Sequence, residues 1–140
     1  MDEAIQPLWI GQSACLTRTF TESDVKKCSE LTGDYSPVYF ADQEAWKHLY
    51  AKPIVPGLLT EGLITQVVSR KLPGCPCLLL QKELIFCRPV HVGDEITAHL
   101  EIIDIHDERN WVTQKVNCYN QHGDEVVKGQ IIIFVIPHGA

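Results

Sequence analysis

The sequence predicts an α+β protein in which a curved antiparallel sheet of about five strands wraps around one long central helix. Three observations support this fold class. An apolar segment with helical periodicity occupies residues 57–71, the apolar period then changes from 3.6 to 2, and four strand-like segments separated by turn residues follow. The chain has no repeats and no Ser/Gly linker, so we expect a single domain over residues 1–140.

The first elements are a short strand around Ala14–Thr19 and a helix from about Glu22 to Thr32. Thr21 suits the N-cap position of this helix, and Asp24 lies three residues later, where its carboxylate can reach back to the cap. Gly33 follows the last apolar residue and can adopt the left-handed conformation that ends a helix. These signals predict where the helix begins and ends.

The central helix is predicted over Gly57–Lys71. Its apolar residues form a stripe so wide that most of the helix must be buried. Pro73-Gly74 ends it. The preceding residues 33–56 contain three prolines, and we expect a shaped loop there, with a short amphipathic piece around Asp42–Leu49.

After the central helix, apolar and polar residues alternate as in strands that have one wet face. The predicted strands lie at about Cys77–Cys87, residues 96–102, Trp111–Tyr119 and Glu125–Ile136. Gly129 within the last strand suggests a bulge or a close backbone approach. A sheet of this kind leaves its edge strands open, and dimerisation through a shared edge would protect them.

Composition excludes several functions. The chain has 12 basic and 18 acidic side chains and a net charge of −6, which disfavours nucleic-acid binding. The longest apolar runs are far shorter than the ~20 residues of a membrane span. No secretory signal pattern is visible, and the six scattered cysteines are expected to be reduced thiols in the cytoplasm. No Cys or His pairs fall at zinc-site spacing, so we expect no metal.

Four motifs resemble the MaoC-like, R-specific enoyl-CoA hydratase and dehydratase family, over about Phe20 to Phe134. The motifs are Phe20-Thr21-x-x-Asp24-Val25, Leu31-Thr32-Gly33-Asp34-Tyr35-Ser36-Pro37, Pro53-Ile54-Val55-Pro56-Gly57-Leu58-Leu59 and Phe86-x-x-Pro89-Val90-x-Val92-Gly93-Asp94-Glu95. The resemblance implies the hot-dog fold, usually paired into a dimer. It also implies a substrate acyl group carried on coenzyme A or acyl-carrier protein, without a bound cofactor.

In that family, water adds across a trans double bond beside the thioester, or leaves it. The chemistry needs a base, an acid and donors for the thioester oxygen. The family supplies them as an Asp, a His five residues later, and backbone N–H groups at the start of the central helix. Asp34 matches the Asp, but Tyr39 replaces the His, and Pro56 replaces a His that usually precedes Gly57. Half of the usual acid/base pair is therefore missing.

The resemblance makes Asp34 and Tyr39 the candidate catalytic residues. The residues themselves also allow a plainer interpretation, in which Asp34 is a turn residue and Tyr39 a packing aromatic. The candidate substrate-binding residues are Ser36, where the family has Asn, together with Gly57, Leu58 and Glu61.

Glu61 lies one turn after Gly57 on an otherwise apolar helix, where the family usually has a small residue. Residues four apart share a helix face, so Glu61 is a candidate to point into the cavity beside Gly57. Hot-dog acyl-CoA thioesterases resemble this arrangement in using a carboxylate from the central helix. The alternative interpretation is a partly exposed Glu that complements the helix dipole.

Three functions stay open at this stage. The first is an acyl-thioester hydratase or dehydratase of fatty-acid or related acyl metabolism. The second is a catalytically impaired subunit that binds acyl thioesters or a catalytic paralogue, and the third is a thioesterase built on Glu61. We expect a homodimer, a higher homo-oligomer or a pair with a paralogous subunit. The phosphates of coenzyme A would need basic side chains near the site, and the candidates are Lys52, Arg70, Lys82 and Arg88.

Overall fold

The computed structural model describes residues 7–40 and 52–137. The elements in chain order are β1 (Ser13–Thr19), α1 (Glu22–Thr32), the short 3₁₀ helix η1 (Pro37–Tyr39), α2 (Gly57–Arg70), β2 (Cys77–Phe86), β3 (Glu95–His106), β4 (Trp111–Tyr119) and β5 (Glu125–Val135). These elements confirm the predicted helices and strands. The amphipathic piece predicted around Asp42–Leu49 lies outside the described residues.

One strand is longer than predicted. β3 continues to His106, whereas the apolar alternation stops at residue 102. The register against β4 shifts between Ile102 and Asp104, which leaves Ile103 exposed. A bulge of this kind breaks the period of two without ending the strand.

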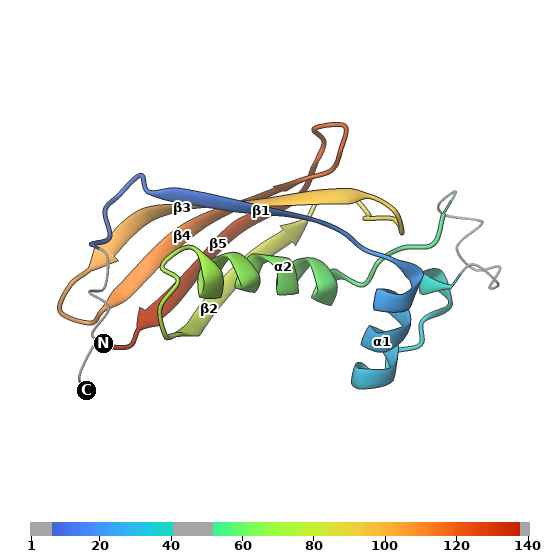
Figure 1. Cartoon of the computed structure of the whole chain (residues 1–140), viewed down its shortest axis with the longest axis horizontal. Coiled ribbons are helices and arrows are strands. Elements are labelled where there is room, and N and C mark those ends of the chain that lie inside the picture. Colours follow the sequence, from blue (N-terminus) through green and yellow to red (C-terminus); the bar gives the residue numbers. More distant parts are fainter. Residues whose placement is uncertain (1–6, 41–51, 138–140) are drawn as a thin grey trace.

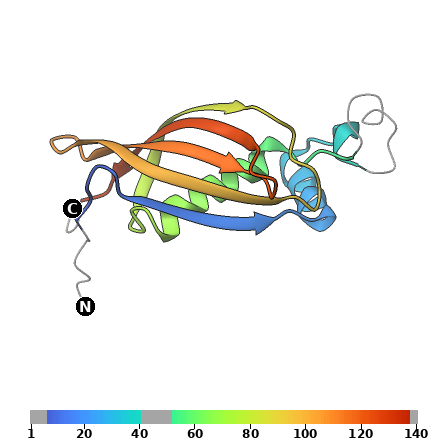
Figure 2. The same cartoon turned by 90° about the horizontal axis from the view of Figure 1, so that it is seen from above.

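The five strands form one antiparallel sheet in the order β1-β3-β4-β5-β2. Figure 1 shows α2 lying along the concave face of this sheet, with α1 beyond one end. The view from above in Figure 2 shows β1 and β2 at opposite edges. This is the curved sheet around one helix that the sequence predicts, and the hot-dog fold that the resemblance implies. No helix among the described residues is long and apolar enough to cross a membrane.

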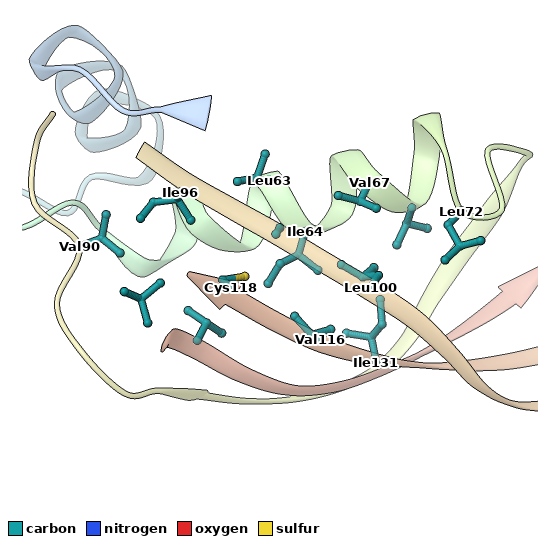
Figure 3. Packing of buried hydrophobic residues seen from close by; sticks show 14 of the residues in the cluster. Leu63, Ile64, Val67, Leu72, Val90, Ile96, Leu100, Val116, Cys118 and Ile131 are labelled. Atoms are coloured by element: carbon teal, nitrogen blue, oxygen red, sulfur yellow. The ribbon is translucent and has the colours of Figure 1, made fainter. Parts of the chain in front are cut away.

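The core explains why α2 needs such a wide apolar stripe. Leu63, Ile64 and Val67 are almost fully buried against the sheet, where they meet Leu100 and Val116 (Figure 3). A polar contact lies just beyond the C-terminal end of α2. There the buried Gln114 side chain donates a hydrogen bond of 2.9 Å to the backbone oxygen of Leu72. This packing holds α2 against the concave face of the sheet.

The predicted capping box of α1 is present. The N–H of Asp24 donates to Thr21 Oγ1 at 3.2 Å, and the N–H of Thr21 donates to Asp24 Oδ2 at 3.0 Å. The backbone hydrogen bond from Thr21 is the main reason why the pKa of Asp24 is lowered. At the other end Gly33 has φ 77° and donates to the oxygen of Ser29 at 2.8 Å, which confirms the predicted left-handed stop. The chain therefore turns sharply into Asp34.

Gly129 lies where β5 passes very close to β2. Its φ is +157°, and a Cβ atom at this position would be 1.9 Å from the backbone oxygen of Glu83. The close backbone approach predicted for this glycine is confirmed. β2 is therefore held tightly against β5 on one side, while its other side forms the edge of the sheet.

Candidate active site

The loop after α1 brings the two predicted catalytic residues together. Asp34 Oδ1 accepts a hydrogen bond from the N–H of Ser36 at 3.2 Å, and Asp34 Oδ2 accepts one from the phenol of Tyr39 at 3.2 Å. Pro37 begins the 3₁₀ turn that places Tyr39 over Asp34. Both carboxylate oxygens therefore have donors within the same loop.

The environment of this pair favours a protonated phenol. Partial burial raises the pKa of Tyr39, and the negative charge of Asp34 raises it further. Burial also raises the pKa of the nearby Cys28 thiol, with Asp34 again contributing. At neutral pH Tyr39 is thus a hydrogen-bond donor. It can accept a proton from another group only if its own phenol proton passes to an acceptor such as Asp34.

A cavity of about 470 Å³ lies beside the first turn of α2. Tyr39, Gly57 and Thr60 line it from the loop and the helix, and Phe86 and Arg88 line it from the end of β2 and beyond. The remaining lining residues have apolar side chains: Val38, Ile54, Val55, Cys87, Pro89 and Val90. Tyr39 therefore connects the Asp34 carboxylate to a cavity at a helix N-terminus.

Gly57 has a steric reason to be glycine. A Cβ atom there would be 2.8 Å from Cε1 of Phe86, so the aromatic ring lies directly against the helix start. The first N–H groups of a helix have no partner within the helix, and the dipole favours negative charge at this end. The beginning of α2 is accordingly suited to hold an oxygen on which negative charge develops.

Thr60 is a functional candidate that the sequence analysis missed. Its side chain is only 1% exposed, and its hydroxyl oxygen has no hydrogen-bond partner among the described residues. An unpaired buried hydroxyl is unfavourable, and a ligand oxygen in the cavity would supply the missing partner. The available signal was a polar residue three positions after Gly57, on the buried side of an apolar helix.

The other predicted substrate-binding residues do not line this cavity. Ser36 is held to Asp34 by its backbone N–H, Leu58 is 50% exposed, and Glu61 forms an ion pair with Lys82 of β2. Among the basic candidates for coenzyme A, Arg88 lines the cavity. The part of the chain that the structure describes contains no group of three or more His, Cys, Asp or Glu side chains that could hold a metal ion.

A curved antiparallel sheet around one helix, with a polar pair beside the helix start, defines a hot-dog protein with a candidate acid/base site. Residues 10–125 match the family model described as MaoC like domain, and the chain belongs to that family.

Similar proteins carry related names. An (R)-specific enoyl-CoA hydratase from Aeromonas caviae is 30% identical over 128 residues, which cover 91% of this chain and 96% of the relative. A 3-hydroxybutyryl-CoA dehydratase from Methylorubrum extorquens is 31% identical over 122 residues, which cover 87% of this chain and 76% of the relative. The solved structure of the (R)-hydratase from A. caviae involved in PHA biosynthesis superimposes with a TM-score of 0.88, at 29% identity, over 94% of this chain and 99% of that chain.

Proposed function

We propose that this protein is a hydro-lyase that adds water to trans-2-enoyl thioesters, or removes water from 3-hydroxyacyl thioesters. The observation that carries the proposal is the hydrogen bond from Tyr39 to Asp34, made by a side chain that also lines the cavity at the start of α2. The named hydratase and dehydratase relatives support the same reaction class. Coenzyme A or acyl-carrier protein carries the acyl group, and no cofactor takes part.

The proposed chemistry uses Asp34 and Tyr39 as a proton relay. As the oxygen of water bonds to C3, a water proton passes to the phenol oxygen of Tyr39, and the phenol proton passes to Asp34 along their hydrogen bond. The raised pKa of Tyr39 means that a phenolate is not left behind. The same proton then returns through Tyr39 to C2, which restores both side chains.

The beginning of α2 supplies the other half of the chemistry. When C3 is attacked, the electrons of the double bond move toward the thioester oxygen, which becomes enolate-like. The N–H of Gly57 and the hydroxyl of Thr60 are the donors that we assign to this oxygen. Arg88, at the same cavity, is the basic residue that we assign to a phosphate of the carrier.

The direct test mixes the purified protein with crotonyl-CoA and follows the loss of the conjugated absorbance. Turnover that disappears in a Tyr39→Phe variant supports the proposal. A folded parent protein that binds butyryl-CoA but gives no hydration at high enzyme concentration contradicts it, and would leave the acyl-thioester-binding subunit as the function. Release of free thiol instead of hydration would indicate a thioesterase.

Glu61 does not support a thioesterase mechanism in this geometry. Its carboxylate pairs with the ammonium group of Lys82, and its side chain is not part of the cavity at Gly57. A nucleophile or base would have to lie against the thioester carbon, which we place at the helix start.

We also propose that two copies of the chain associate through β2. This edge strand is unusually apolar, with large side chains that are 46% to 59% exposed: Leu78, Leu79, Leu80, Ile85 and Phe86. Exposed apolar edges are commonly protected by pairing, and a second copy of β2 would extend the sheet across the dimer. The partner would also cover the open side of the cavity at Gly57, to which Phe86 belongs.

Sedimentation equilibrium tests this assembly. The parent chain should sediment as a dimer, and Ile85→Asp should shift it toward the monomer and lower hydration together with it. A matched Ile103→Asp variant places the same charge at an exposed site on the bulge of β3 and should stay dimeric. A monomeric parent at micromolar concentration would contradict the proposal.

The six unpaired cysteines support a reducing compartment, and we propose the cytoplasm.

A further inference from the structure

The helix α2 and the edge strand β2 face each other along a gap that has three levels. At one end Phe86 lies against Gly57 and lines the candidate active site. At the other end a second cavity of about 470 Å³ is lined by Thr65, Val68, Cys77, Leu79, Ile131 and Ile133, among others. Between the two cavities, the ammonium group of Lys82 donates a hydrogen bond to the carboxylate of Glu61 and forms an ion pair with it.

The register of the sheet shows that Lys82 faces the helix. Lys82 is paired with Ile131, and Phe86 with Val127, and both partners in β5 are buried on the concave face. Side chains of paired residues lie on the same face of a sheet. Lys82 therefore lies on the same face as Phe86, between the levels of the two cavities.

The residues of α2 that face β2 follow the same order from one cavity to the other. Gly57, Glu61 and Thr65 are spaced by four residues and share one face of α2. Glu61 is thus one turn from the active-site cavity and one turn from the second cavity. Its side chain is 19% exposed, whereas that of Lys82 is 49% exposed, so the carboxylate is the more enclosed member of the pair.

We propose that the Glu61–Lys82 pair closes the passage between the two cavities and so limits the length of the acyl group that the active site accepts. The inference rests on the proposed function and adds a specificity determinant to it. Glu61 lies about 6 Å beyond Gly57 along the helix axis. A four-carbon acyl group has three carbon–carbon bonds of about 1.5 Å and so spans at most about 4.5 Å, which lies within that distance. The site accordingly prefers short acyl groups.

The barrier has both a steric and an electrostatic origin. A longer alkyl chain would have to pass between the side chains of Glu61 and Lys82. Its passage would separate the two charges. The Glu61 carboxylate, whose side chain is 19% exposed, would then lie beside apolar surface without its cation, which is unfavourable. Beyond the pair, the second cavity offers the largely apolar surface of Val68, Leu79 and Ile133. Removal of the pair should therefore admit a longer chain to a site that suits it.

The test compares the binding of butyryl-CoA and octanoyl-CoA by calorimetry, since neither ligand requires catalysis. The parent should bind butyryl-CoA at least as tightly as octanoyl-CoA. In a Glu61→Ala/Lys82→Ala variant, the affinity for octanoyl-CoA relative to butyryl-CoA should rise about tenfold or more, because additional methylene groups leave water. Hydration of trans-2-octenoyl-CoA relative to crotonyl-CoA should rise in parallel.

Two further variants complete the design. Glu61→Ala/Lys82→Met keeps an apolar, flexible side chain on β2 and should show the same change, even where the double alanine variant is poorly folded. Glu108→Ala/Lys128→Ala removes the same two charges at exposed sites outside the gap and should behave as the parent. A parent that already prefers octanoyl-CoA, or well-folded variants with an unchanged ratio, would overturn the inference. Changed binding ratios without any hydration would instead overturn the proposed function alone.

Discussion

The phenol of Tyr39 donates a hydrogen bond of 3.2 Å to the carboxylate of Asp34, and the same tyrosine lines the cavity at the first turn of α2. The hydrogen bond has a direction, because an ionised carboxylate only accepts. A proton taken up at the cavity side of Tyr39 can therefore leave toward Asp34. In the proposed mechanism, this two-residue path takes the place of the histidine that the resembled family has.

The relay predicts that both residues are needed for hydration. Asp34→Asn keeps the shape of the side chain but cannot accept a proton, and Tyr39→Phe removes the phenol. Each change should lower kcat for crotonyl-CoA by about 10²- to 10⁴-fold, the range typical of general acid–base groups. The double variant should be no worse than the poorer single variant, because both act on one path. Additive losses in single-turnover experiments would argue against a shared path.

A histidine at position 39 should give an active enzyme. The resembled family has histidine five residues after the aspartate, and an imidazole accepts a proton near neutral pH far more readily than a phenol. We expect Tyr39→His to raise hydration, with a pH dependence that follows the titration of the new imidazole. Circular dichroism should show that the fold is retained. A folded variant that loses activity would mean that the cavity has adapted to the phenol.

The environment of Tyr39 predicts its titration. Burial and the charge of Asp34 place its pKa above the ordinary value of 10.0. A difference ultraviolet titration of the parent against Tyr39→Phe should isolate this phenol, and Asp34→Asn should move its midpoint downward. Because the pKa is higher in the folded state, the stabilising contribution is present below pH 10 and is lost as pH rises through the folded value. The parent should therefore lose stability faster than Tyr39→Phe under alkaline denaturation.

Thr60 should affect binding and stability in opposite directions. Thr60→Val keeps the shape but removes a buried hydroxyl without a partner, so the free protein should be unchanged or more stable by about 1 kcal/mol in urea unfolding. If the hydroxyl holds the thioester oxygen, kcat/KM for crotonyl-CoA should fall about tenfold. Thr113→Val, on the outer face of β4, is a suitable control. A decrease in stability together with unchanged kinetics would show a structural role instead.

Gly129 should tolerate no side chain. Gly129→Ala would place Cβ against the backbone oxygen of Glu83, and we expect a loss of about 3 kcal/mol or more in the free energy of unfolding. Gly62 has nothing within 4 Å of an added Cβ and lies within α2. Gly62→Ala should therefore stabilise the protein by about 0.5–1 kcal/mol. Equal effects of the two substitutions in chemical denaturation would contradict this account.

Much of the architecture follows from local signals in the sequence. The capping box at Thr21, the left-handed Gly33 and the wide apolar stripe after Gly57 predicted both helices, because each signal depends only on neighbouring residues. β3 was predicted too short, because the bulge at Ile103 interrupts the alternation that defines a strand. Asp34 and Tyr39 were identified through a family resemblance. The structure adds the hydrogen bond between them, and their catalytic role stays a prediction.

The sequence by itself determined the elements, their order and the helix start at Gly57, since helical and strand periodicities are properties of consecutive residues. Only the tertiary structure decided where the polar side chains of α2 point. Thr60 and Glu61 are adjacent in the chain, yet the helix turns about 100° between them. One hydroxyl is thereby buried at the candidate active-site cavity, and the neighbouring carboxylate is paired with Lys82, a residue 21 positions away on the facing strand.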